Sequence, residues 1–272
     1  MKQAEFYEIL NAVAPKTLSD EYCEKYGAYD NSGVLISVGE QASKAVFSLD
    51  FSLAAVQKAI ESKADVLVTH HPAIYGKIGE ILIQDTLGEK IALCIQNGIS
   101  VMSMHLNLDG AIGGVDESLA FGVCQSAKGA SQQNEPIENL KIRDELSVGG
   151  YGRAYDISPV CLQSLVENMK KTFQTDKLIV YGDVKTEINR VASFCGAGGD
   201  ESAVDFAIRE GANVVISSDF KHHVLAYALE RGLCVIALTH YAAENYGFEK
   251  FYQKVRSQTN VECLYHTDER LL

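Results

Sequence analysis

The sequence is short of positive charge. Its 24 Lys and Arg residues are outnumbered by 36 Asp and Glu residues, which gives a formal net charge of -12 at pH 7. Proteins bind nucleic acids largely by placing Lys and Arg against phosphates, so this balance disfavours a DNA- or RNA-binding function. We therefore expect no nucleic acid among its partners.

Long apolar runs are also missing. No stretch reaches the roughly 18–20 apolar residues that a membrane-spanning helix needs, and the first residues, MKQAEFYEIL, lack the apolar region of a signal peptide. We expect a cytoplasmic protein that does not bind membranes. The 272 residues, 47% hydrophobic and 22% charged, allow two globular domains or one large α/β domain.

Closely paired cysteines are absent as well. The seven cysteines are odd in number, widely spaced and never in a CxxC arrangement, which argues against a disulfide framework and a thiolate zinc site. Cys195, in SFCGAGGDES, has two interpretations: a functional thiol, or a buried thiol beside a tight turn. The glycines of this loop could present N–H groups to an anion, but they lack the spacing of a nucleotide-binding motif.

What the sequence does contain is a regular alternation of helices and strands. Apolar periodicity predicts a helix over 53–64 before a strand over 65–70, and a helix over 84–98 before a strand over 99–105. Helices of this length between strands indicate an α/β layer with largely parallel pairing.

The two halves of the chain resemble each other. AAVQKAIESKADVLVTHH and SAVDFAIREGANVVISSD share a helix, an apolar strand and a polar pair at the strand end. We predict an α/β fold of two similarly built domains with mixed, largely parallel sheets. The first domain is expected over 1–125 and the second over 126–272, with the option that the C-terminal helix returns to the first.

A polar stretch without apolar periodicity, residues 125–136, is interpreted as the linker between the halves. After it the α/β rhythm resumes. Ser158 is predicted to cap a helix whose first residue is Pro159.

Six of the seven histidines lie at or just beyond the end of a predicted strand. In parallel α/β folds, polar residues at these ends form the binding sites. His70 and His71 follow one strand directly and precede Pro72. Because adjacent residues of an extended strand point to opposite faces, each histidine is expected to serve one of two metals where the chain turns.

Further candidate ligands follow other strands. His105 and Asp109 lie in MHLNLDGAIGG, where Asp109 has the alternative role of capping the next helix. His240 and Glu244 are four residues apart, which places them on one face of a helix. Imidazoles and carboxylates together suit Zn, Fe, Mn, Co or Ni, and two such ions need a bridge that Glu244 or a hydroxide could supply.

The segment SSDFKHH adds Asp219, His222 and His223 at another strand end. In one interpretation Asp219 caps a helix and the histidines are surface residues. In the other, one histidine orients a ligand or donates a proton.

The order and spacing of these motifs identify a resemblance. YDNSGVLI, ADVLVTHHPAIY, HLNLD, GGYGRAYD, CGAGGDES, SSDFKHH and THYAAE together resemble the GTP cyclohydrolase I type 2 homologues, also called the NIF-three-like family. The resemblance covers nearly the whole chain. It implies a two-domain α/β protein that assembles into a toroidal homohexamer and holds two divalent metal ions.

The resemblance also assigns residues. It places the metal ligands at His70, His71, Asp109, His240 and Glu244. It places His223 and His105 at accessory positions, which makes them the candidate catalytic proton carriers. Ser218 and Thr239 stand where the family usually has glycine, which restricts the backbone without removing a ligand.

Two functions are compatible with these features. The resemblance implies a metal-dependent hydrolase that opens a ring in a small, nucleotide-like substrate. The alternative is a metal-binding regulatory or scaffold protein without turnover. Coordination positions left open by five ligands on two metals favour the enzyme.

Overall fold

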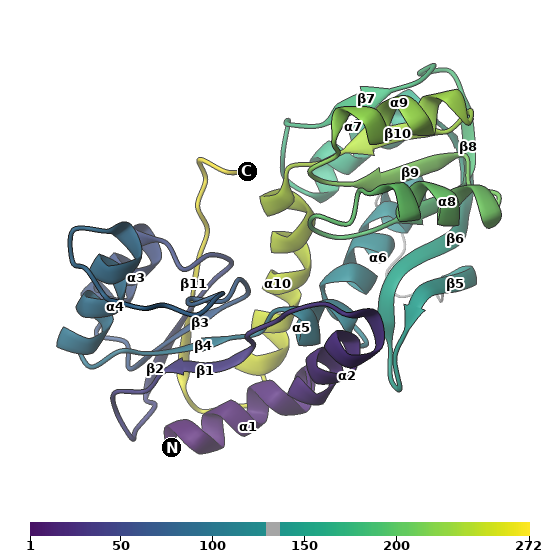
Figure 1. Cartoon of the computed structure of the whole chain (residues 1–272). Helices are drawn as coiled ribbons and strands as arrows, with labels where there is room; N and C mark the ends of the chain where they lie inside the picture. Colours follow the sequence, from purple (N-terminus) through teal and green to yellow (C-terminus); the bar gives the residue numbers. More distant parts are fainter. Residues whose placement is uncertain (129–136) are drawn as a thin grey trace. The chain divides into compact units, whose positions relative to one another are not determined.

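The computed structural model describes residues 1–128 and 137–272. The chain forms two compact units, whose elements are labelled in Figure 1. Unit 1 comprises Met1–Ala111 and Phe248–Asp268, and unit 2 comprises Ile112–Gly247 and Glu269–Leu272.

The sequence predicted two domains that divide at residue 125, and this division stays a prediction. Helix α6 (Val115–Lys128), on which that division falls, belongs to unit 2. Helix α10 (His240–Arg256) begins in unit 2, and its residues from Phe248 onward belong to unit 1.

Unit 1 is built on a five-stranded sheet with the order β1-β4-β3-β2-β11. Its strands are β1 (Gly33–Ile36), β2 (Lys44–Ser48), β3 (Val66–Thr69), β4 (Ser100–Ser103) and β11 (Glu262–His266). All pairs are parallel except β1 with β4. The carboxyl ends of β2, β3 and β4 therefore share one edge with the amino end of β1.

Helices cover both faces of this sheet. Those of unit 1 are α1 (Gln3–Val13), α2 (Lys16–Tyr26), α3 (Leu53–Ser62), α4 (Thr86–Gln96) and α5 (Leu106–Gly110). Helices α3 and α4 pack on one face, where Val56 and Ile91 join the same apolar cluster as Leu67 of β3. On the other face, Phe47 of β2 contacts Phe248 and Phe251 of α10.

Unit 2 contains a six-stranded sheet with the order β5-β6-β8-β9-β10-β7. Its strands are β5 (Glu138–Glu145), β6 (Gly150–Cys161), β7 (Ile179–Tyr181), β8 (Glu187–Ser193), β9 (Val214–Ser217) and β10 (Cys234–Ala237). The central pairs β8–β9 and β9–β10 are parallel, and the outer pairs are antiparallel. The predicted α/β class with mixed sheets is confirmed, although parallel pairing in this unit is limited to the centre.

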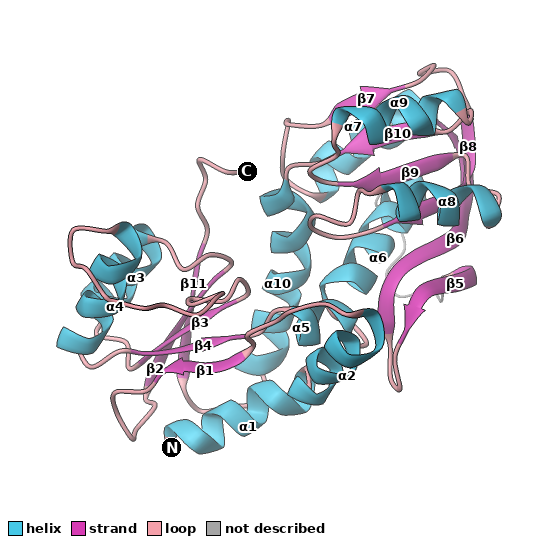
Figure 2. Ribbon diagram, viewed as in Figure 1, coloured by secondary structure: helices cyan, strands magenta, loops and turns pink. Residues whose placement is uncertain are grey.

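The remaining helices flank the second sheet. They are α7 (Leu162–Thr172), α8 (Glu201–Arg209) and α9 (His222–Glu230). Helices α8 and α9 lie on one face, and α6 and α7 lie on the other (Figure 2). Val204 of α8 and Val224 of α9 share an apolar cluster with Val215 of β9.

The predicted helix start at Ser158 and Pro159 is wrong. Both residues lie in β6, and α7 begins only at Leu162. The register of β6 against β8 shifts between Asp156 and Val160, so the missing N–H of Pro159 falls where the strand pairing is interrupted.

The predicted linker over 125–136 falls partly outside the described residues. Its first residues, up to Lys128, form the last turn of α6 and are therefore helical. Residues 129–136 are not described.

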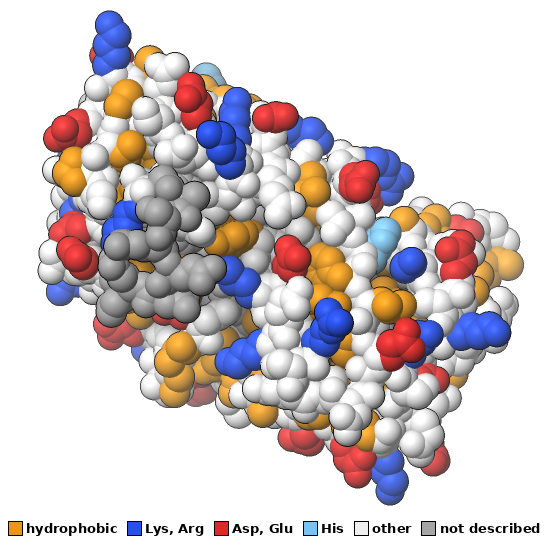
Figure 3. Space-filling model, turned by 180° about the vertical axis from the view of Figure 1, so that it is seen from behind, with side chains coloured by type: hydrophobic (Ala, Val, Ile, Leu, Met, Phe, Trp, Pro, Cys, Tyr) orange, Lys and Arg blue, Asp and Glu red, His pale blue; other side chains and the backbone are white. Residues whose placement is uncertain are grey.

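Two further expectations concern the surface. None of the helices that the structure describes combines the length and apolarity needed to cross a bilayer. On the face shown in Figure 3, Lys and Arg side chains are interspersed with Asp and Glu and form no continuous basic surface.

Candidate metal centre

The adjacent histidines lie just beyond the end of β3. The backbone N–H groups of His70 and His71 both donate to Leu49 O, at 3.1 and 3.0 Å. The two rings lie 5.0 Å apart between centroids, tilted by 47°. The alternation expected of an extended strand does not apply, because the strand ends at Thr69 and the chain turns there.

His105 joins this pair from the end of β4. Its ring centroid lies 5.3 Å from that of His70 and 5.8 Å from that of His71. One ring nitrogen from each of the three histidines lies within 4.8 Å of the other two, so the group could hold a metal ion. Asp109, inside α5, brings a carboxylate oxygen to 3.5 Å from His70 Nε2.

Each of these rings is oriented through its Nδ1 atom. His70 Nδ1 donates to Met104 O at 2.7 Å, and His71 Nδ1 donates to Asp50 Oδ1 at 2.7 Å. A carbonyl and a carboxylate can only accept, so Nδ1 carries the proton and Nε2 carries the lone pair that binds metals.

Asp30 orients His105 in the same way. Its Oδ1 accepts from His105 Nδ1 at 2.7 Å, and its Oδ2 accepts from Ser19 and Ser32 hydroxyls at 2.5 Å each. Burial alone would raise the pKa of Asp30, but the hydrogen bonds and the attraction of His105 hold this pKa well below its usual value. Asp30 is therefore an anion that is held in place next to the His105 ring.

Sequence reasoning missed Asp30 and Asp50 as orienting groups. Asp50 follows the carboxyl end of β2 and Asp30 precedes the amino end of β1. Both ends lie at the sheet edge where the histidines emerge. Acidic residues next to neighbouring strand ends were the signal that could have found them.

Unit 2 has its own group of candidate ligands at the start of α10. His240 Nε2 lies 3.1 Å from Glu244 Oε1, as their four-residue spacing predicted. His240 Nδ1 is paired with Asp219 Oδ2 at 2.5 Å. Thr239, a departure from the family pattern, accepts from Ala242 N at 3.1 Å and so caps the helix.

The glycine loop of unit 2 packs against Glu244. Asp116 Oδ1 accepts from Cys195 N at 2.9 Å, and Gly196 follows with φ +57°. A Cβ on Gly196 would overlap Glu244 Oε1. Asp200 caps α8 by accepting from Ala203 N at 2.8 Å, so a carboxylate takes the position that the sequence suggested for an anion. Cys195 itself is buried, in keeping with the structural interpretation of its thiol.

Comparison with known families gives the same assignment as the sequence. The model of the Duf34/NIF3 (NGG1p interacting factor 3) family matches residues 1–269. The chain belongs to this family. The resemblance predicted from the motifs is thereby confirmed.

Relatives of this Duf34/NIF3 chain share about a quarter of its residues. A GTP cyclohydrolase 1 type 2 homolog of Methanocaldococcus jannaschii is 27% identical over 266 residues, covering 97% of this chain and 98% of the relative. NGG1-interacting factor 3 of Saccharomyces cerevisiae is 24% identical over 244 residues, covering 83% of each chain.

Solved structures share the fold. Reduced HcgD from Methanocaldococcus jannaschii matches with a TM-score of 0.78 and 28% identity over 97% of each chain. A Bacillus cereus protein related to NIF3 matches with a TM-score of 0.78 and 19% identity, covering 99% of this chain and 98% of the other.

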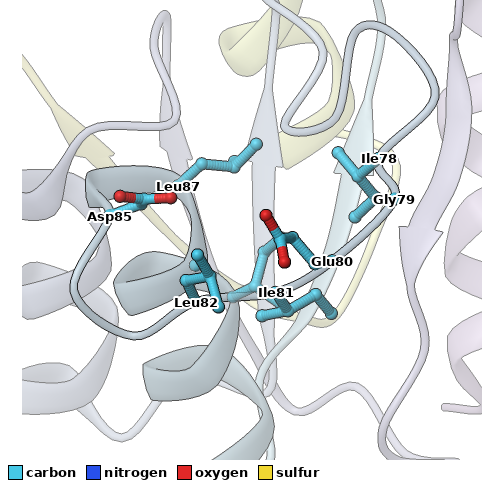
Figure 4. A pocket seen from close by; sticks show the side chains of 9 residues that line it. Ile78, Gly79, Glu80, Ile81, Leu82, Asp85 and Leu87 are labelled. Carbon is cyan, nitrogen blue, oxygen red and sulfur yellow. The ribbon is translucent and has the colours of Figure 1, made fainter.

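A cavity of about 210 Å³ lies elsewhere in unit 1 of this Duf34/NIF3 protein. Figure 4 shows it between the segment around Ile78, Glu80 and Leu82 and the start of α4 at Leu87. It shares no residue with the histidine group.

His223 lies in unit 2, at the second residue of α9. Its side chain is 62% exposed and lies 3.5 Å from Glu201 at the start of α8. It comes four residues after Asp219, the partner of His240. Its catalytic role, like that of His105, stays a prediction.

A Gly196→Ala variant tests whether the glycine loop positions Glu244. We expect metal affinity to fall about 10- to 100-fold, the range typical of changes around metal ligands, because the added Cβ displaces the Glu244 carboxylate. Isothermal titration with Co(II) measures this affinity. Gly211→Ala is the matched control, because Gly211 also has positive φ (+72°) but nothing within 4 Å of an added Cβ. Equal losses in both variants would contradict the prediction.

Proposed function

We propose that this protein is a metal-dependent hydrolase with a dinuclear centre of divalent ions. Its ligands are His70, His71, Asp109, His240 and Glu244. The observation that carries the proposal is the anchoring of the imidazoles through Nδ1, which leaves Nε2 as the donor atom in His70, His71 and His240.

The residues fit the ions that the family resemblance implies. Three imidazole nitrogens and two carboxylates suit Zn, Fe, Mn, Co or Ni better than Mg or Ca, which prefer oxygen ligands. Ions bound here would act as Lewis acids and lower the pKa of water to near 7, which provides a nucleophile at neutral pH.

The chain's own residues then have separate tasks. Asp50 and Asp219 hold the rings of His71 and His240 in place. The packing of Gly196 against Glu244 restricts the position of that carboxylate. We assign proton transfer to the substrate to His223, which is exposed and lies outside the ligand set.

The names of the relatives support a substrate class for this proposal. Several are GTP cyclohydrolase 1 type 2 homologs, which supports a nucleotide-like substrate and a ring-opening hydrolysis. Five protein ligands on two ions leave coordination positions for such a substrate.

Metal content tests the centre directly. The purified protein, reconstituted with divalent ions, is expected to hold up to two ions per chain, and His71→Ala or Glu244→Ala is expected to lower that number. Elemental analysis gives the count, and His222→Ala, at an exposed histidine of α9, is the control. A reconstituted wild type without metal would contradict the proposal.

A turnover assay distinguishes a hydrolase from a metal-binding protein without enzymatic activity. Incubating the metal-loaded protein with a panel of nucleotides and phosphoesters, followed by mass spectrometry, is expected to show ring-opened or cleaved product. The yeast relative is named an interacting factor, which supports the alternative of a metal-binding regulatory or scaffold protein. Absence of turnover across the panel would favour that alternative.

We also propose that the protein assembles as a toroidal homohexamer, on the strength of the family resemblance. Light scattering is expected to give a mass close to six chains. A protein that is strictly monomeric at micromolar concentration would contradict this assembly.

A further inference from the structure

Two tyrosines border the histidine group of unit 1. Tyr75 lies in the loop after β3, and its ring centroid is 6.2 Å from that of His105, with the ring planes at 87°. Tyr29 packs on Tyr75 in a T-shaped pair whose centroids are 5.3 Å apart. We propose that Tyr75 and Tyr29 form an aromatic platform on which a planar, nucleobase-like ring of the substrate stacks beside the histidines.

This inference deepens the proposed function and rests on it, because it assumes a nucleotide-like substrate. It names the side chains that would select such a substrate by its flat ring. The metal ligands have no part in this selection, so the platform can be tested by binding alone.

The first observation is the exposure of the two rings. Tyr29 and Tyr75 are each 53% exposed, whereas the side chain of the neighbouring His105 is only 18% exposed. Tyr75 thus combines contact with a largely buried imidazole and an open aromatic surface that a ligand can cover. Aromatic side chains next to a few well-placed polar groups are the usual lining of sites for small molecules.

The second observation is that the hydroxyl of Tyr75 is already used. It donates to Tyr29 O at 3.1 Å, and a phenol has only one proton to donate. What Tyr75 offers to a ligand is therefore mainly its ring. Aromatic faces bind nucleobases by stacking, which requires a flat ring and no particular hydrogen-bonding edge.

The two loops that carry the platform are tied to each other. Besides the bond from Tyr75 to Tyr29, Asn31 Nδ2 donates to Ile74 O at 2.6 Å. Two hydrogen bonds between adjacent residues of the same loops fix the position of the tyrosine pair. Side chains that are held before a ligand arrives lose little conformational entropy on binding.

The loop that carries Tyr29 also fixes His105. Asp30 Oδ1 accepts from His105 Nδ1 at 2.7 Å, and Ser32 Oγ accepts from His105 N at 3.1 Å. One short segment, residues 29–32, therefore positions both the platform and the nearest histidine. A ring stacked on Tyr75 would be held at a set distance from the histidine group.

The experiment uses the full-length, Co(II)-loaded protein with two ligands, GMP and ribose 5-phosphate, which is GMP without its base. Equilibrium dialysis gives the Kd of each. Wild type is expected to bind GMP about 5- to 100-fold more tightly, the usual contribution of stacking one base on an aromatic side chain. Equal affinities for the two ligands would overturn the inference.

Substitutions at Tyr75 show whether the preference comes from its ring. Tyr75→Leu is expected to weaken GMP binding about 5- to 100-fold and to leave ribose 5-phosphate binding unchanged. Tyr75→Phe, which keeps the ring, is expected to keep the preference for GMP. Tyr227→Leu is the matched control, because Tyr227 lies on α9 and its hydroxyl also makes a hydrogen bond, to Asp205 at 2.6 Å.

Metal content of each variant shows whether the histidine group is intact. Tyr29→Leu is a second, independent variant and is expected to reduce the preference for GMP in the same direction. Unchanged GMP affinity in Tyr75→Leu, or equal losses for GMP and ribose 5-phosphate, would overturn the inference.

The turnover panel of the proposed function distinguishes the two possible failures. If nothing is turned over but the preference for GMP depends on Tyr75, the platform stands and the hydrolase is wrong. If a phosphoester without a planar ring is turned over and wild type shows no preference for GMP, the hydrolase stands and the platform is wrong.

Discussion

A His223→Ala variant is expected to keep its metal ions and to lose turnover by about 10²- to 10⁴-fold, the usual contribution of a positioned proton donor or acceptor. The expectation depends on the position of the ring outside the ligand groups. His223 lies on α9 with Glu201 at 3.5 Å, whereas the His240 ring is held by Asp219 and Glu244.

The measurement needs metal content and turnover from the same preparation. His222→Ala is the matched control, because the neighbouring residue is also an exposed histidine in the first turn of α9. It is expected to keep both metal and turnover. If His223→Ala loses metal in parallel with turnover, His223 is a ligand and the five-residue set is wrong.

The second large effect is expected at the buried ion pair of unit 2. Asp116→Asn should lower the free energy of unfolding by about 3–5 kcal/mol, because it leaves the Arg153 guanidinium buried without its counter-charge. The side chains of Arg153 and Asp116 are 1% and 0% exposed. The Asp116 carboxylate also accepts from Gly152 N and Cys195 N at 2.9 Å each, so it joins β6 to the glycine loop.

A double variant shows whether the charge is the cause. Combining Asp116→Asn with Arg153→Met is expected to recover part of the loss, because the unpaired cation is removed. Urea unfolding, with hydrogen exchange at amides of β6 and β8, measures the effect on unit 2. Asp20→Ala breaks the exposed pair with Lys16 and is expected to change stability by no more than about 1 kcal/mol. A comparable loss in Asp20→Ala would contradict the explanation.

The helices and strands near the ligands could be predicted because their signals are local. The helix expected over 53–64 and the strand over 65–70 correspond to α3 and β3, since apolar periodicity and the Ser52 cap lie within the segment itself. The start of α7 could not be predicted in the same way. Ser158 and Pro159 have the local signature of a helix start, but they lie in β6 between Asp156 and Val160, which both pair with β8.

The sequence by itself determined which residues stand at strand ends, and it therefore selected His70, His71, His105 and His240 as candidates. Glu244 was added because it follows His240 by four residues on a helix. Chain order is enough for this, because a histidine directly after an apolar strand emerges at the carboxyl edge of a parallel sheet. Only the tertiary structure decided how the rings are held. Asp30 is 75 residues from His105 and Asp50 is 21 residues from His71, and no local pattern reports such contacts. Strand order places these carboxylates at one edge of the first sheet, and the turn after Thr69 brings both adjacent histidines toward His105.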